Sequence, residues 1–185
     1  VALMRQRWPW LSVRSLKSAL MTTAKIPVWQ SDSFAPPPAA VMERGSGRVD
    51  LGSDLMSKPA FICPPSHSFG SWNVGNGPIV VEKVFDIRKW SYCRTWSLDV
   101  VQTSGHPNLE VTASPSTLYE GSSRDFTLQV QADSSVLPGE YEGFVRLTSG
   151  TDTLHVPYWI RIINIPIPLG NILLVDDDRD SEEFL

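Results

Sequence analysis

Hydrophobic and polar residues alternate with a period of two through the second half of the chain. In the clearest run, Phe126, Leu128 and Val130 alternate with Thr127 and Gln129. Successive side chains of a strand point to opposite faces, so this period predicts strands with one buried face. The predicted strands are residues 66–69, 80–88, 94–102, 109–113, 124–132, 141–148 and 153–163. Because no helix-length segment separates them, we expect an antiparallel β-sandwich rather than a parallel sheet with crossover helices.

The last predicted strand places polar and aromatic residues opposite its apolar face. The apolar series begins at Leu154, which leaves His155, Trp159 and Arg161 on the other side. Beyond Asn164 two prolines alternate with isoleucines over residues 165–168. Proline has no backbone N–H, so this stretch predicts an extended linker that leaves the sandwich.

The period changes to that of a helix in the first part of the chain. Ser12 is a candidate N-cap, and Val13, Leu16, Leu20 and Ala24 recur on one face of a predicted helix over residues 11–24. Residues 2–7 resemble the end of an earlier helix that stops before Pro9. Residues 25–58 predict loops with at most a short helix near 51–56, and we expect this segment to pack on another part of the protein.

These patterns divide the chain into three parts: residues 1–58, a complete sandwich over 59–164, and residues 165–185, which hold the linker and the start of a further module. The total of 185 residues suits one ordinary domain with pieces of its neighbours.

Composition excludes several function classes. The chain is 42% hydrophobic and 19% charged, which is typical of a folded domain. Its 16 basic and 20 acidic side chains give a net charge of −4, which argues against a surface that neutralises nucleic-acid phosphates. No stretch approaches the roughly 20 uninterrupted apolar residues of a transmembrane helix. We therefore expect neither a nucleic-acid partner nor a membrane span.

Candidate metal and redox chemistry is sparse. His67, His106 and His155 have no second ligand at metal-binding spacing, so we assign no metal ligand. Cys63 and Cys93 are the only cysteines, and their spacing leaves both a disulfide and two separate thiols open. The acidic run Asp176, Asp177, Asp178 follows a predicted strand. We interpret this run as a solvated strand end, with calcium or magnesium binding as the alternative.

Several stretches near the N-terminus resemble the end of a known catalytic domain. The runs QRWP (residues 6–9) and LKSALMTTA (residues 16–24) resemble the closing helices of the subtilisin-like serine peptidases. The run GSGRVDL (residues 45–51) is similar to the glycine-rich turn that leads into the last helix of that domain. The resemblance implies that residues 1–58 are the C-terminal end of a truncated α/β subtilase domain.

The second half resembles the fibronectin type III-like sandwich that follows the catalytic domain in many large secreted subtilases. The runs that carry this likeness are SFG (68–70), RTW (94–96), SPSTL (114–118) and PGEYEGFV (138–145). Each run is weak alone, but they occur in order behind a subtilase-like ending. The combined resemblance covers about residues 1–164.

The resemblance implies a parent enzyme that hydrolyses peptide bonds outside the cytoplasm or in the cell envelope, with structural calcium plausible in that parent. Such enzymes use an aspartate, a histidine and a serine nucleophile. None of the family's signature strings around these three residues occurs in the chain. We therefore assign no catalytic, cofactor-binding or metal-binding residue, and we expect the chain alone to be inactive. Its implied partners are the remainder of the catalytic domain and, through the parent, protein or peptide substrates.

A function from another class stays open. The sandwich could be a non-catalytic immunoglobulin-like binding or adhesion module, with Trp29, Trp72, Trp90 and Trp159 as candidate contact residues. Packing in the core is the competing interpretation for these side chains.

Overall fold

The computed structural model describes residues 2–26, 39–50, 60–89, 94–119 and 124–165. Several sequence predictions lie outside these ranges: the short helix near 51–56, Trp29, Trp90, Cys93, the proline linker after Ile165, and the acidic run at 176–178.

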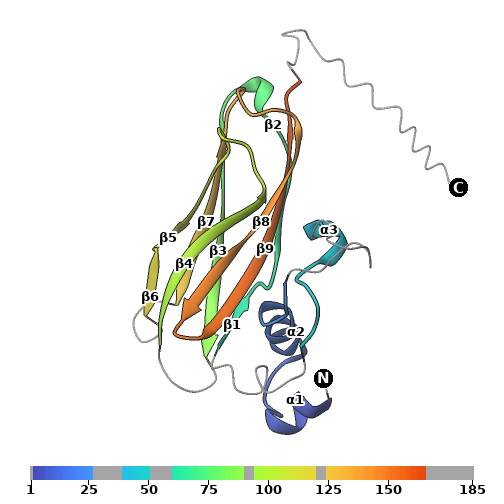
Figure 1. Ribbon diagram of the computed structural model, residues 1–185, viewed down its shortest axis with the longest axis vertical. Helices are drawn as coiled ribbons and strands as arrows, with labels where there is room; N and C mark the ends of the chain where they lie inside the picture. The colour runs from blue at the N-terminus through green and yellow to red at the C-terminus, as the bar shows by residue number, and fades with distance from the viewer. Residues whose placement is uncertain (1, 27–38, 51–59, 90–93, 120–123, 166–185) are drawn as a thin grey trace, which may run out of the picture.

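The strands form two sheets that face each other as a sandwich (Figure 1). The four-stranded sheet has the order β1 (Ala60–Cys63), β3 (Ile79–Lys89), β7 (Asp125–Ala132), β5 (Glu110–Ser114). The five-stranded sheet has the order β2 (His67–Asn73), β9 (Asp152–Ile163), β8 (Gly139–Ser149), β4 (Thr95–Ser104), β6 (Thr117–Tyr119). A single turn of 3-10 helix, η1 (Val74–Asn76), follows β2. The predicted β-sandwich is confirmed.

The chain changes sheets between its first two strands. β1 pairs with β3, and β2 then pairs in parallel with β9, whereas the other strand pairs are antiparallel. Pro64 and Pro65 lie between the two strands and have no backbone N–H, so the first ladder ends there. The sequence patterns missed β1 and β6. All four residues of β1 are buried, so it shows no alternation, and β6 has only three residues.

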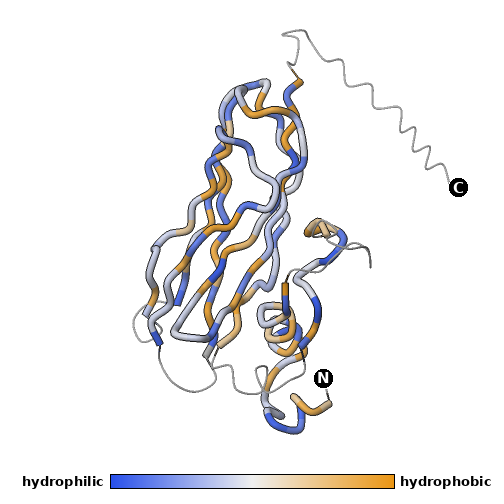
Figure 2. The backbone as a smooth tube through the Cα atoms, viewed as in Figure 1, coloured by the Kyte–Doolittle hydropathy of each residue, from blue (hydrophilic) through white to orange (hydrophobic). Residues whose placement is uncertain are grey.

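Hydrophobic and hydrophilic residues alternate along the strands (Figure 2), and the buried apolar side chains form one core between the sheets. Phe126, Leu128 and Val130 of β7 are buried as predicted, and Trp96 of β4 lies opposite them in the same core. Phe85 of β3 stacks on Phe126, with 5.1 Å between the ring centroids. Apolar burial of this kind is the main term that stabilises the sandwich.

Tyr141 closes the turn before β8. Its hydroxyl donates to the carbonyl oxygen of Leu137, 2.7 Å away and four residues upstream. Immunoglobulin-like sandwiches use a tyrosine in this way at the start of a central strand. Partial burial raises the pKa of Tyr141, so the hydroxyl stays protonated and keeps donating at neutral pH.

Two helices precede the sandwich, and the second of them lies beside β1 (Figure 1). They are α1 (Ala2–Arg7) and α2 (Val13–Thr22), and Ser12 caps α2 by accepting from the N–H of Ser15 at 3.1 Å. The predicted buried face of α2 was partly wrong. Val13 is 71% exposed, and the buried residues of the helix are Ser15, Leu16, Ser18, Ala19 and Thr22. Small side chains line this face because α2 lies close to the β1 backbone.

A third helix, α3 (Val41–Arg44), lies on the outer face of the five-stranded sheet. The sequence patterns predicted a loop here, since four residues are too few for a helical period to be recognised. After α3 the backbone turns through Gly45 and Gly47, whose φ angles are 57° and 112°. A Cβ at Gly47 would lie 2.5 Å from the carbonyl oxygen of Lys25, so only glycine fits this turn.

Candidate docking interface between the helical segment and the sandwich

We call residues 2–26 and 39–50 the helical segment. Buried hydrogen bonds join this segment to the sandwich. At the centre of this contact lies Glu142 of β8, which is only 8% exposed. Its Oε2 accepts from the backbone N–H of Val41 at 2.8 Å. The hydroxyl of Thr103 donates to the other carboxylate oxygen at 3.4 Å. A buried carboxylate requires such donors because desolvation without hydrogen bonds is costly.

Glu142 satisfies a donor that α3 cannot satisfy itself. The first N–H groups of a helix have no partner within the helix. Here the N–H of Val41 donates to Glu142, and the N–H of Ala40 donates to the Glu43 side chain at 3.1 Å. The first turn of α3 therefore begins directly above β8, and its hydrogen bond fixes where the segment lies on the sheet.

A second buried polar contact lies on the neighbouring strand. The Nε2 atom of His155 in β9 is 2.7 Å from the carbonyl oxygen of Ser46. A carbonyl oxygen only accepts, so Nε2 carries the proton in this contact. Ser46 follows α3 directly, within the turn formed by Gly45 and Gly47. The turn thus presents a backbone oxygen to the sheet.

Apolar and cationic groups fill the space between these two contacts. The Phe144 ring lies 6.1 Å from that of His155, and the Arg44 guanidinium lies 6.0 Å from the Phe144 ring centroid. Pro157, paired with Phe144, is also buried. The face of β8 and β9 that the sequence assigned to solvent is therefore covered here by residues 39–48.

The core side of the same strands is closely packed around Gly143 and Tyr158. Gly143 lies under the Tyr158 hydroxyl, and a Cβ at Gly143 would lie 2.3 Å from the carbonyl oxygen of Val101. Burial and, second, the negative charge of Glu142 raise the pKa of Tyr158 far above its ordinary value. Tyr158 is therefore a neutral phenol at every physiological pH.

The helical segment also contacts β1 through a small apolar cluster. Its members are Met4, Leu16, Ala19, Phe61 and Cys63. The Cys63 thiol is free and donates to the Ser18 hydroxyl at 3.3 Å. The helical segment also has internal contacts. The backbones of Lys25 and Arg48 form an isolated β-bridge, and the Lys25 ammonium lies 2.7 Å from the Asp50 carboxylate.

The three histidines of the sequence analysis lie in separate places. His67 contacts Phe69 in β2, His106 accepts from the N–H of Asn108 at 3.2 Å, and His155 lies in the docking interface. Within the ranges that the structure describes, no three His, Cys, Asp or Glu side chains form a group that could hold a metal ion. None of the described helices is long and apolar enough to cross a membrane.

The tryptophans proposed for a binding module have different surroundings. Trp159 is half-buried on the covered face of β9. Trp72 is 40% exposed, and its indole N–H donates to the carbonyl oxygen of Phe69 at 2.7 Å. The two described residues thus do not form one aromatic surface.

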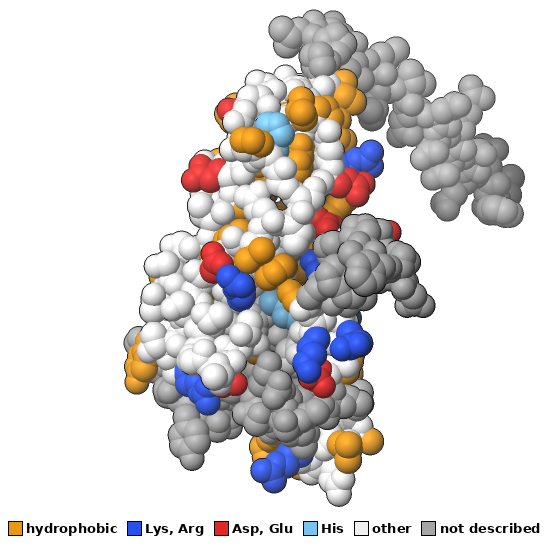
Figure 3. All heavy atoms as spheres, in the orientation of Figure 1, with side chains coloured by type: hydrophobic (Ala, Val, Ile, Leu, Met, Phe, Trp, Pro, Cys, Tyr) orange, Lys and Arg blue, Asp and Glu red, His pale blue; other side chains and the backbone are white. Residues whose placement is uncertain are grey.

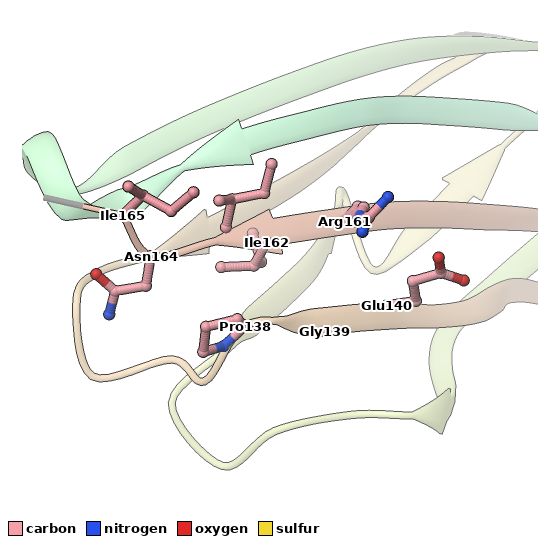
Figure 4. A pocket seen from close by; sticks show the side chains of 8 residues that line it. Pro138, Gly139, Glu140, Arg161, Ile162, Asn164 and Ile165 are labelled. Atoms are coloured by element: carbon pink, nitrogen blue, oxygen red, sulfur yellow. The ribbon is translucent and has the colours of Figure 1, made fainter. Parts of the chain in front are cut away.

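A pocket of about 440 Å³ lies at the far ends of β8 and β9 (Figure 4). Glu140 and Arg161 face each other across the two strands on one side of it, and Asn164 and Ile165 lie on the other. The Asn164 amide donates to the carbonyl oxygen of Ser134 at 2.9 Å. The described residues that line the pocket include one acidic side chain, Glu140, and one basic side chain, Arg161. They include neither a pair of carboxylic acids nor a nucleophilic side chain.

The surface view shows basic and acidic side chains interspersed on the face displayed (Figure 3). The described residues include the ion pairs of Arg146 with Asp99 at 2.7 Å, and of Arg94 with Asp152. This face has no dominant sign of charge.

Comparisons with known proteins do not show a family for this chain. No family model and no curated protein matches the chain. Among solved structures, an endo-fucoidan hydrolase of glycoside hydrolase family 107 is 13% identical with a TM-score of 0.38, over 63% of this chain and 15% of the other. Domains 1–6 of the surface layer protein SbsC are 14% identical with a TM-score of 0.36, over 58% and 13%. The CooA pilin subunit from enterotoxigenic Escherichia coli is 14% identical with a TM-score of 0.31, over 59% and 100%. This chain thus spans a small part of the first two proteins.

Sequence reasoning missed Glu142 altogether. A signal was present, because Glu142 lies between Tyr141 and Phe144 in the most apolar part of a predicted strand. An acid in such a run is rarely buried without a partner. The partner, however, is the backbone N–H of Val41, 101 residues away, which no side-chain pattern reveals.

Proposed function

We propose that this chain is a non-catalytic part of a secreted or cell-envelope subtilisin-like serine endopeptidase. In this proposal the helical segment is the end of the catalytic domain and the sandwich is an accessory module docked on it. The parent enzyme hydrolyses peptide bonds, and the chain itself lacks the catalytic triad.

The observation that carries the proposal is the order of the matching motifs. The LKSALMTTA run contains most of α2, the glycine-rich run contains the turn at Gly45 and Gly47, and the four sandwich runs follow in sequence. The LKSALMTTA run contributes Leu16 and Ala19 to the contact with β1, and the glycine-rich run contributes Ser46 to the contact with β9. A module that evolved with its neighbouring domain is expected to have specific contacts of this kind.

Exposed apolar residues on the helical segment support the same proposal. Leu3 of α1, Trp10 of the connection and Val13 of α2 are 68%, 75% and 71% exposed, although other residues of both helices are buried against β1. A contiguous exposed apolar surface marks a site that another protein part covers. In the proposed enzyme, the remainder of the catalytic domain covers these side chains.

The test is the reactivity of the purified 185-residue chain. We expect no cleavage of casein and no covalent labelling by a fluorophosphonate probe, which reacts with activated serines. An active subtilisin labelled in parallel is the positive control. Labelling of a serine in this chain at a comparable rate would contradict the proposal.

A separate assay addresses the adhesion alternative. The chain is immobilised and exposed to a panel of cell-wall polysaccharides and extracellular proteins, with the Trp72→Ala variant as control. We expect no retention that depends on Trp72. Retention of one ligand that the variant abolishes would favour the binding module instead.

A further inference from the structure

Over most of its length, one edge of strand β3 has no partner among the described strands. β7 pairs with residues 79–86 of β3, whereas β1 pairs only with residues 86–89. Among the described strands, β1 and β7 are the only ones that pair with β3. Residues 79–85 therefore have a strand on one side only.

The backbone groups on this edge can be identified from the ladder. The N–H of Ile87 donates to the carbonyl oxygen of Arg124 at 2.8 Å, on the β7 side. Backbone groups of an antiparallel strand alternate between its two sides. The N–H and C=O groups of Val80, Glu82 and Val84 consequently point to the free side, where they form a template for another strand.

One residue on this edge breaks the apolar pattern of the core face. Lys83 pairs with Leu128, which is fully buried, so both side chains are on the core-facing side. The residues two positions away on either side of Lys83, Val81 and Phe85, share this face. Lys83 is half-buried there, between apolar neighbours.

We propose that Lys83 prevents the free edge of β3 from pairing with the same edge of a second copy. A second copy is the relevant partner because it presents an identical row of unpaired groups at the protein's own concentration. An antiparallel pair centred on Glu82 would match the free backbone groups of both strands. It would place each Lys83 opposite the other copy's Val81, on the core-facing side.

This arrangement is unfavourable for two reasons. The new strand would cover Lys83, and its ammonium would lose water without gaining a carboxylate on that face. The two Glu82 side chains would also lie directly opposite each other on the outer face, where like charges repel. Inward-pointing charges are a known means of keeping edge strands from associating.

The test compares three variants of the 185-residue chain with the original by light scattering and sedimentation over a range of concentrations. Lys83→Val removes the charge and favours a β-strand, so we expect the dimerisation constant to rise at least ~100-fold. Lys83→Arg keeps the charge and should behave as the original. Arg146→Val is the matched control, since it removes one positive charge from β8, which has a partner strand on both sides.

Two further readouts separate this role from a role in folding. The melting temperature of Lys83→Val should equal or exceed that of the original chain, since valine suits a core-facing strand position. Amide exchange at Val80, Glu82 and Val84 should slow at least tenfold in the Lys83→Val dimer. A monomeric Lys83→Val variant, equal association of Arg146→Val, or a dimer without protection at these amides would each overturn the proposal.

Discussion

Single residues decide how the helical segment and the sandwich meet. Glu142 and His155 are both buried, and both bond to backbone groups rather than to other side chains. A backbone partner fixes position more strictly than a flexible side chain does, because the backbone is held by its own secondary structure. These two residues therefore define the register of α3 on the sheet.

Replacing Glu142 tests this role. Glu142→Ala leaves the Val41 N–H without an acceptor, which costs about 1–3 kcal/mol. We expect faster amide exchange across residues 39–48, with the strands of the sandwich still protected. Glu140→Ala is the control, since this exposed carboxylate lies on the same strand, and it should leave exchange at residues 39–48 unchanged.

A pH effect is expected at His67. Desolvation and, second, the positive charge of Lys83 lower the pKa of His67 below its ordinary value of 6.5. The unfolded chain then binds a proton more readily than the folded chain. Above about pH 6.5 His67 is neutral in both states and does not reduce the free energy of unfolding. That free energy decreases as the pH falls from there toward the lowered pKa, because the unfolded chain takes up the proton first.

Denaturant unfolding at pH 7.5 and pH 5.5 measures this effect. His67→Phe keeps a ring against Phe69 and Phe85 but cannot titrate. The loss of unfolding free energy on acidification should be smaller in this variant than in the original chain. An equal loss in both proteins would show that His67 has no part in the pH dependence.

At the scale of elements, the strands were predictable and the docking of the helices was not. Alternation located β3, β4, β7, β8 and β9 to within a few residues because apolar side chains recur mainly at every second position of each strand. β1 shows no alternation because α2 covers the face that would otherwise be wet. The buried face of α2 was predicted wrongly at Val13, which is exposed. Small residues such as Ala19 pack against β1 instead.

Helix α2 should depend on one apolar residue more than on the others. Leu16→Ala removes the largest α2 side chain of the cluster against β1 and leaves a cavity, which costs about 3 kcal/mol. We expect amide protection in α2 to fall by roughly 100-fold. Val13→Ala on the exposed side of the same helix should change protection little. Equal effects of the two substitutions would mean that the contact with β1 does not stabilise α2.

At the scale of the whole molecule, the sandwich and the helical segment form one packed body with two contact areas. One contact area joins α2 to β1 and β9, and the other joins α3 and its following turn to β8 and β9 (Figure 1). The strand pattern predicted the sandwich but neither contact area. The contact of α3 and its turn could not be predicted, because side chains of the sheet bond there to backbone groups about a hundred residues away. The division of the chain at residue 59 stays a prediction.

We propose that this chain is part of a subtilisin-like endopeptidase whose nucleophile lies outside the 185 residues. Fluorophosphonate labelling of the natural polypeptide that contains the chain, followed by mapping of the modified peptide, tests this proposal. We expect one labelled serine, located N-terminal to Val1 within a Gly-Thr-Ser-Met sequence, and no label within the 185 residues. A labelled serine inside this chain, or a natural polypeptide that contains no reactive serine, would contradict it.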